Sequence, residues 1–470
     1  MVDRVLRYIG PVAMVLLMLR FVSAATMPLT DPDFWWHIRL GRMVLDNGIA
    51  DTVANWAPSA TADWTPTQLL PEMLAAGLYD RWGLPAIAWL YGVGLVAFVL
   101  VAYSVCRRGA GSLPAALATG LCVMASSGSL SPRPQVLSFI FLLVVVAAWL
   151  RTEQDLKPRW WLIPLTWLWA LCHGSWITSA LVGAAVVIGL ALGRRLTRRE
   201  LVRLASVPVL CVAIVGVTPI GPDLLLGPLI VNERTEYIAE WQRTSLLGPA
   251  PWAVILMVVV TLVAGAKARR ADPASPVPLG SLLLLLQAVG WLFLAERTVA
   301  IAACIVAPLF ATAVSGLLQR ARGSDEATSV PRAESLLLGI GALVSIVALT
   351  VAVPHTTRAG AVPTEFGQAL EALPHGTVVL NDDKLGGWLL LRHPNTAPVV
   401  DGLFDAYSLD HLRSYRRIVG LAPGWERDLR STGATWAVLP EDSAVCEALI
   451  DASWEVVDRD RGFALLRAPA

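Results

Sequence analysis

The feature that most constrains this chain is a series of long apolar runs. About eleven runs, most of them near the length that crosses a bilayer, lie at residues 8–25, 84–105, 113–130, 134–150, 160–172, 175–193, 203–220, 250–266, 278–295, 297–317 and 333–353. Hydrophobic residues make up 56% of the 470 residues and charged residues 16%, whereas soluble globular proteins carry about 25% charged residues. This balance excludes disordered chains, collagens and disulfide scaffolds, argues against a wholly soluble enzyme, and predicts a multi-pass membrane protein.

The charged residues are segregated between the two predicted sides of the membrane. If the N-terminus is cytoplasmic, every second loop is basic, and these loops carry Arg107 and Arg108; Arg151, Lys157 and Arg159; Arg194, Arg195, Arg198 and Arg199; Lys267, Arg269 and Arg270; and Arg320, Arg322 and Arg332. An odd number of spans then places the tail outside the cytoplasm. The net charge is only +1, which argues against nucleic acid as a partner.

We predict two domains from this arrangement. Residues 1–353 form a transmembrane domain with long exterior loops at 27–83 and 221–249. The first run can also be interpreted as a signal peptide, with Ser23-Ala24-Ala25 as a weak cleavage site, but we prefer an uncleaved span. Residues 354–470 have a soluble composition. There, strand-like runs at 377–380, 397–401, 435–439 and 463–467 alternate with helical patterns, notably at 408–419 and 443–452, which predicts a small α/β domain.

The first candidate site residues follow the first span directly, in Asp31-Pro32-Asp33-Phe34-Trp35-Trp36-His37. Two carboxylates at a membrane surface can deprotonate an acceptor hydroxyl or hold a divalent cation. The Trp pair is expected to seat the segment at the membrane interface, with a surface helix after it. The alternative is that Asp33 is an ordinary helix cap.

Two more candidates lie on the same predicted side. Glu72 is an isolated acid in an apolar stretch, where it needs a partner; alternatively it is a helix-start acid beside Pro71. Arg133 lies between Pro132 and Pro134 at the mouth of a span. There it can present its guanidinium to a phosphate or a carboxylate, or it is an interfacial anchor.

Three further candidates lie in other predicted exterior turns. His173 precedes Gly174-Ser175 and can donate to a phosphate or ligate a metal, or be a hydrogen-bonded turn residue. Ser175 has no nucleophile-elbow motif around it. Glu240 is followed by Trp241, and Arg297 is a candidate phosphate clamp that can equally pair with Glu296, Glu240 or Glu72.

The order and motifs of the chain resemble the GT-C superfamily of polyprenyl-phosphate-dependent glycosyltransferases, and most of all a group of bacterial GT-C-like membrane proteins. The resemblance covers most of the chain. The matching motifs are Asp31, Asp33, Trp35, Trp36 and His37; Arg133-Pro134-Gln135; Trp169 with His173-Gly174; Glu240-Trp241; and, in the tail, 385–389 and 399–402. Two positions depart from the pattern, because Leu171-Cys172 stands where an Asn is expected before the His-Gly turn and Leu403 stands where an Arg is expected. These departures bear more on the tail than on the Asp pair.

The resemblance implies a mostly helical, GT-C-like transmembrane bundle in a bacterial plasma membrane. It implies transfer of a sugar from a polyprenyl-phosphate donor to a glycan, lipid or protein acceptor, with inversion. Asp33, with Asp31 beside it, is then the candidate base. The candidate substrate-binding residues are His37, Glu72, Arg133, His173, Glu240 and Arg297. We expect these groups to share one hollow at the lipid boundary. No cofactor is required, although two carboxylates and a phosphate can hold a divalent cation. The rival interpretation is an inactive GT-C-like scaffold or a transporter with an exterior partner-binding domain.

Overall fold

The structure is a computed structural model that describes residues 2–194, 196–226, 237–274, 277–322, 330–360 and 362–469. Residues 227–236 of the predicted exterior loop 221–249 lie outside the described residues. Contacts divide the chain into two compact units. The helical unit contains the described residues of Met1–Thr26, Trp89–Pro228 and Ile238–His355, and the sheet unit contains those of Met27–Ala88 and Thr356–Ala470, with Tyr237.

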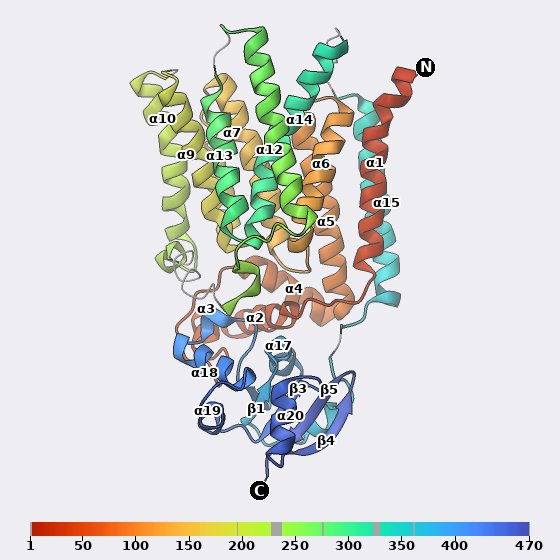
Figure 1. The fold of residues 1–470 in the computed structure, drawn as a ribbon, viewed down its shortest axis with the longest axis vertical. Helices are drawn as coiled ribbons and strands as arrows, with labels where there is room; N and C mark the ends of the chain where they lie inside the picture. The colour runs from red at the N-terminus through yellow and green to blue at the C-terminus, as the bar shows by residue number, and fades with distance from the viewer. Residues whose placement is uncertain are drawn as a thin grey trace. The chain divides into compact units, whose positions relative to one another are not determined.

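Long helices dominate the helical unit (Figure 1). They are α1 (Val2–Ala25), α5 (Leu84–Arg107), α6 (Ser112–Ser126), α7 (Gln135–Asp155), α8 (Leu162–Ala170), α9 (Ile177–Leu192), α10 (Arg198–Ala213), α12 (Pro249–Ala271), α13 (Leu279–Leu294), α14 (Val299–Arg322) and α15 (Arg332–Thr356). Eight of the described helical segments are long and apolar enough to cross a membrane. The remaining three predicted spans correspond to the shorter helices α6, α8 and α13. The prediction of a multi-pass helical membrane protein is therefore confirmed.

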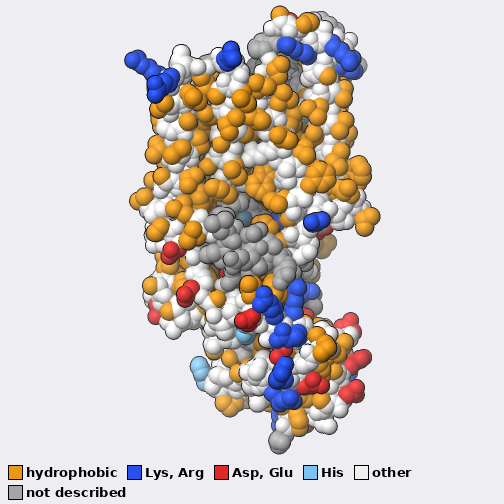
Figure 2. All heavy atoms as spheres, turned by 60° about the vertical axis from the view of Figure 1, so that its left-hand side comes forward, with side chains coloured by type: hydrophobic (Ala, Val, Ile, Leu, Met, Phe, Trp, Pro, Cys, Tyr) orange, Lys and Arg blue, Asp and Glu red, His pale blue; other side chains and the backbone are white. Residues whose placement is uncertain are grey.

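The surface of the helical unit is suited to lipid. Large apolar side chains are exposed along it, among them Val209 at 64%, Leu286 at 65% and Val351 at 64%. Figure 2 shows hydrophobic side chains over the sides of the bundle and Lys and Arg gathered at one end. Exposed apolar area on this scale is typical of a surface that faces a membrane rather than water.

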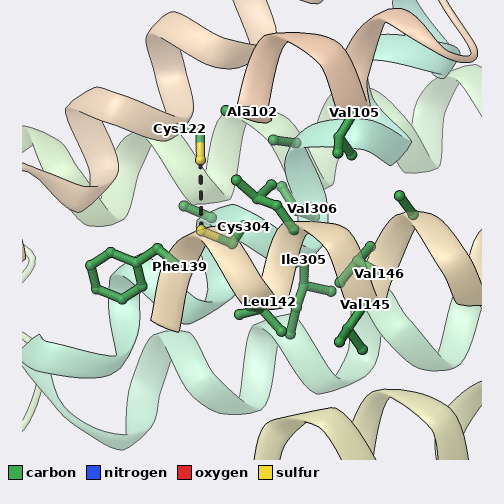
Figure 3. Close-up of a cluster of buried hydrophobic side chains, with 14 of the residues drawn as sticks. Ala102, Val105, Cys122, Phe139, Leu142, Val145, Val146, Cys304, Ile305 and Val306 are labelled. Carbon is green, nitrogen blue, oxygen red and sulfur yellow. Dashed lines mark hydrogen bonds between the residues drawn. The ribbon is translucent and has the colours of Figure 1, made fainter. Parts of the chain in front are cut away.

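The interior of the helical unit is closely packed. Figure 3 shows part of this core, where side chains of α5, α6, α7 and α14 meet, among them Phe139 of α7 and Cys304 of α14. Cys122 of α6 and Cys304 lie with their sulfur atoms 4.0 Å apart, and all six cysteines are buried and free. Glycine allows the closest approach, because a Cβ on Gly189 of α9 would lie 2.3 Å from the backbone of Gly280 in α13. Close packing of this kind holds the helices in fixed positions, and with them the polar residues at the helix ends.

The sheet unit holds a five-stranded sheet in the order β2-β1-β3-β5-β4. The strands are β1 (Thr377–Asn381), β2 (Thr396–Pro398), β3 (Trp436–Pro440), β4 (Glu455–Asp460) and β5 (Phe463–Arg467). The first three pair in parallel, whereas β5 is antiparallel to β3 and β4. The predicted α/β domain is confirmed, and four of its strands were expected. The fifth, β4, is a mostly exposed edge strand with four charged residues, so no hydrophobic alternation marks it.

The same unit contains helices from two distant parts of the chain (Figure 1). Three of them, α2 (Asp33–Asn47), α3 (Ile49–Ala54) and α4 (Leu69–Trp82), come from the predicted loop 27–83. The tail adds α16 (Gly367–Glu371), α17 (Asp383–Arg392), η8 (Phe404–Ala406), α18 (Leu409–Val419), α19 (Trp425–Thr432) and α20 (Ala444–Asp451). Contacts thus group this loop with the tail. A boundary between two domains near residue 353 stays a prediction.

Candidate functional site

The first group of candidate residues lies where α2 begins in the sheet unit. The carboxylate of Asp31 accepts a hydrogen bond from the backbone N–H of Asp33, at 3.0 Å. This short turn directs the chain into the helix, whose N-terminal dipole favours acidic groups. Both side chains are half-buried. The side chain that bonds to the helix start is thus that of Asp31, whereas the alternative prediction was helix capping by Asp33.

A buried pair follows one turn further along α2. The Nδ1 atom of His37 lies 2.7 Å from Oε1 of Glu72 in α4, and the two residues are 4% and 1% exposed. Burial raises the pKa of Glu72 well above its ordinary value. One proton between Nδ1 of His37 and Oε1 of Glu72 avoids a buried net charge. Glu72 therefore has the partner that its apolar setting requires, and the pair joins α2 to α4.

Glycines of the tail pack directly against the start of α2. A Cβ on Gly402 would lie 2.7 Å from Nε1 of Trp36 and 2.9 Å from Oδ1 of Asp33. A Cβ on Gly387, in α17, would lie 2.9 Å from the backbone nitrogen of Trp36. The expectation that Trp35 and Trp36 face the membrane interface is wrong, because both are buried, at 5% and 6% exposure. Their aromatic faces serve the packing of the sheet unit instead.

Asp401, which precedes Gly402, is a buried acid to which the sequence analysis gave no role. Its carboxylate accepts hydrogen bonds from Trp56 Nε1 at 3.0 Å, Tyr407 Oη at 2.9 Å and Leu403 N at 2.7 Å. Complete burial raises the pKa of Asp401 to about 6, although these donors and the Arg39 guanidinium act in the opposite direction. In the sequence, Asp401-Gly402 is visible only as part of a motif. The buried hydrogen bonds of Asp401 could not be predicted from it, because the donors belong to residues 56, 403 and 407.

The second group, which we call the arginine cluster, consists of Arg133, His173, Glu240 and Arg297 in the helical unit. Glu240, in η6 (Ala239–Trp241), receives a hydrogen bond from Arg133 at 2.6 Å and lies 3.5 Å from Arg297 of η7 (Glu296–Thr298). Among the partners considered for Arg297, the structure thus gives Glu240. Glu240 thus contacts both guanidinium groups and holds Arg133 and Arg297 on either side of one carboxylate.

Local geometry fixes the proton of His173 in this cluster. The backbone N–H of Ser175 donates to Nδ1 at 3.1 Å, and the Ser175 hydroxyl lies 2.9 Å from the same atom. An imidazole nitrogen that accepts carries no proton, so the neutral ring carries it on Nε2. Burial, and secondly the charge of Arg297, lower the pKa of His173 to about 3. His173 is therefore a neutral N–H donor at physiological pH.

The Nε2 atom of His173 lies 3.4 Å from Nη2 of Arg297. Both nitrogens are donors in the tautomer that Ser175 selects. Two neighbouring donors from different elements suit a ligand oxygen that accepts from both, as a phosphate oxygen does. The ring of Trp241 lies 5.9 Å from the Arg297 guanidinium and holds it from another side.

The predicted residues therefore gather into two groups, one in each unit. Asp31, Asp33, His37 and Glu72 lie in the sheet unit, and the arginine cluster lies in the helical unit. The expectation of one shared hollow concerns both units and stays a prediction. For the part of the chain that the structure describes, no three His, Cys, Asp or Glu side chains gather as metal ligands. Asp31 and Asp33 alone are two protein ligands, so we derive no step through a metal.

Comparison with known proteins identifies similar folds. The apo crystal structure of the Archaeoglobus fulgidus oligosaccharyltransferase aligns with a TM-score of 0.59 at 12% identity, over 92% of this chain and 69% of that one. The same protein in complex with Zn and sulfate gives 0.53 at 11% identity, over 91% and 68%. The arabinofuranosyltransferase AftD from Mycobacteria gives 0.50 at 16% identity, over 99% of this chain and 40% of that one. No protein-family model and no curated protein matches the sequence.

At these low identities, the structural similarity establishes the fold alone. The predicted GT-C-like fold is confirmed, because both solved proteins are GT-C membrane glycosyltransferases and the alignments cover nine-tenths or more of this chain.

Proposed function

We propose that this protein is a membrane glycosyltransferase that moves a sugar from a polyprenyl-phosphate donor to an acceptor hydroxyl, with inversion. The observation that carries the proposal is the half-buried carboxylate of Asp33, held at the start of α2 by Asp31 and Gly402, in a chain with a GT-C-like fold. The two fold neighbours are named as an oligosaccharyltransferase and an arabinofuranosyltransferase, which supports transfer of a sugar as the reaction.

In the proposed step, Asp33 accepts the proton of the acceptor hydroxyl as the oxygen attacks the anomeric carbon. The bond from that carbon to the phosphate oxygen breaks, and polyprenyl phosphate leaves with the electron pair. A single displacement inverts the anomeric centre. Phosphate is a good leaving group, so the reaction needs a base and positive charge rather than a strong acid.

The arginine cluster is suited to the leaving phosphate. Its two guanidinium groups, on Arg133 and Arg297, are N–H donors for a phosphate, and Glu240 holds both of them in place. His173 adds a neutral N–H donor without adding charge. We assign His37 and Glu72 the task of holding α2, because their polar atoms are buried against one another.

The test uses the full chain in lipid nanodiscs with a panel of polyprenyl-phosphate monosaccharides and a cell-envelope glycan extract. Release of free polyprenyl phosphate and mass gain of the acceptor are followed by mass spectrometry. We expect Asp33→Asn to lower transfer by about 10²–10⁴-fold. Asp46→Asn changes an exposed acid of the same helix and is the matched control.

Two outcomes would overturn the proposal. Full transfer activity in Asp33→Asn would show that Asp33 is not the base. If the wild-type chain turns over none of the donors, the rival function, an inactive scaffold or a transporter, is favoured. NMR of the product tests inversion separately, since retention of the donor's anomeric configuration excludes single displacement.

We also propose a bacterial plasma-membrane location with a cytoplasmic N-terminus and the tail on the opposite side. The support is the alternation of basic loops along the sequence. Alkaline phosphatase fused after the tail tests the orientation, because that reporter is active only outside the cytoplasm. An inactive fusion in cells that express the full chain would reverse the assignment.

A further inference from the structure

We propose that a cavity within the sheet unit binds a neutral saccharide, as the acceptor in the reaction proposed above. The cavity has a volume of about 500 Å³. Its walls come from residues 58–61, from β1 and β2, and from α18 and α19. The loop that contributes Asp33 and the tail therefore build this cavity together, and the proposal rests on the proposed function of Asp33.

The lining combines hydroxyl groups with apolar side chains. Ser59, Thr61, Ser414 and Thr432 contribute hydroxyls, and His411 contributes an imidazole. Val378, Ala397 and Val399 provide the apolar part. A sugar ring has the same division, with hydroxyls on its rim and C–H groups on its faces. Pockets that combine apolar contact with a few placed polar groups are typical of small-ligand sites.

The charges around the cavity favour a neutral ligand over an anionic one. Of the described residues that line it, none is Lys or Arg, and Asp410 is acidic. Helix α18 carries three arginines, and two of them contact the lining. Arg413 pairs with the lining residue Asp410, and Arg417 pairs with Asp428 and donates to the lining hydroxyl of Ser414 at 3.1 Å. The Arg416 guanidinium lies 4.4 Å from the ring of Tyr237. Because Arg413 and Arg417 already have carboxylate partners, a phosphate in this cavity would compete with those carboxylates for them.

A short chain of contacts joins the cavity wall to Asp33. The ring of His411 stacks on Tyr407, with centroids 5.0 Å apart. The Tyr407 hydroxyl donates to Asp401, and the next residue, Gly402, lies against Oδ1 of Asp33. Nε2 of His411 lies 2.8 Å from the carbonyl of Val399, which holds the ring at the wall. A saccharide in the cavity would therefore lie beside the loop that positions the proposed base.

The experiment measures binding by the full chain in nanodiscs, without donor. The probes are neutral oligosaccharides of four to six sugars, a hyaluronan tetrasaccharide as an anionic comparison, and inorganic phosphate. Ser431→Trp fills the cavity from an exposed lining position. Ala452→Trp places the same side chain on an exposed position outside the lining and is the matched control. Thermal unfolding of both variants verifies that the sheet unit is folded.

We expect at least one neutral oligosaccharide to bind, Ser431→Trp to weaken its Kd by tenfold or more, and Ala452→Trp to leave it unchanged. Stronger binding of hyaluronan or phosphate, no neutral oligosaccharide bound, or equal affinity in Ser431→Trp would each overturn the proposal. Asp33→Asn separates this idea from the proposed function. If Asp33→Asn loses transfer but still binds the oligosaccharide, both the proposed function and the proposed acceptor site are supported. If transfer depends on Asp33 but is unchanged in Ser431→Trp, only the proposed acceptor site is overturned.

Discussion

The two groups of candidate residues are held in place by different physical means. In the arginine cluster, the side chains of Arg133, Glu240 and Arg297 are 15%, 34% and 23% exposed, and they hold one another by charge. At the start of α2, Asp33 is positioned by close packing against glycine and by a backbone turn. The first arrangement depends on charge number and the second on volume. Substitutions that change charge or volume alone can therefore distinguish the two regions.

After Asp33→Asn, the largest effect is expected from Arg297→Ala. Loss of this guanidinium removes one of the two cationic groups that contact Glu240, and with it a charged donor to a departing phosphate. We expect transfer to fall by roughly 10²–10³-fold, the usual cost of losing one preorganised group that stabilises transition-state charge. Steady-state transfer from the active donor measures it. Arg243→Ala removes an exposed arginine nearby and is the control; equal losses in both variants would contradict a specific phosphate site.

The next effect concerns pH and stability in the sheet unit. Burial raises the pKa of Asp401 from 3.8 to about 6. At a pH between these two values, the carboxyl group is therefore protonated in the folded protein and ionised in the unfolded chain. This group therefore stabilises the fold less as pH rises from 4 to 6, by up to about 3 kcal/mol. Asp401→Asn cannot titrate, so the unfolding free energy of wild type minus that of the variant should fall over this window. Denaturant unfolding between pH 4 and 7 measures it, and a constant difference would contradict the shift.

A smaller effect is expected from Gly402→Ala, which changes volume and no charge. The added methyl group meets Trp36 Nε1 and Asp33 Oδ1 at under 3 Å, so Asp33 must move. A displacement of this size in a positioned group lowers transfer by roughly 10- to 100-fold. Gly367→Ala, at a position with open space around it, is the control. If Gly402→Ala transfers at the wild-type rate while remaining folded, close packing does not position the base.

The smallest effect is expected from Ser175→Ala. It removes the hydroxyl beside Nδ1 of His173 but keeps the backbone N–H that selects the tautomer. We expect a loss of a few-fold at most. With the His173 pKa at about 3, neither this variant nor the wild type should show a titration of transfer from His173 between pH 5 and 8. A pH profile with an inflection near 6.5 that disappears in His173→Gln would contradict a neutral donor.

Local patterns were sufficient for much of the fold. Apolar runs predicted the long helices, since a bilayer imposes a length that is visible in the sequence. Short strand-like runs predicted β1, β3 and β5 within about a residue. The edge strand β4 was missed because its exposed charged residues interrupt any such run. The shortness of α8, only nine residues, was also not visible, because the apolar run continues on both sides of it.

Apolar runs and strand-like runs established a multi-pass helical protein with an α/β tail, and residue type singled out Asp33, His173 and Arg297. Which of the candidate groups meet depended on the three-dimensional fold. It joined Glu240 to Arg133 and Arg297, His37 to Glu72, and Gly402 to Asp33. Periodicity reports which face of an element is apolar, whereas these contacts join residues 35 to several hundred positions apart. Such pairings depend on how the elements pack, and no local pattern encodes them.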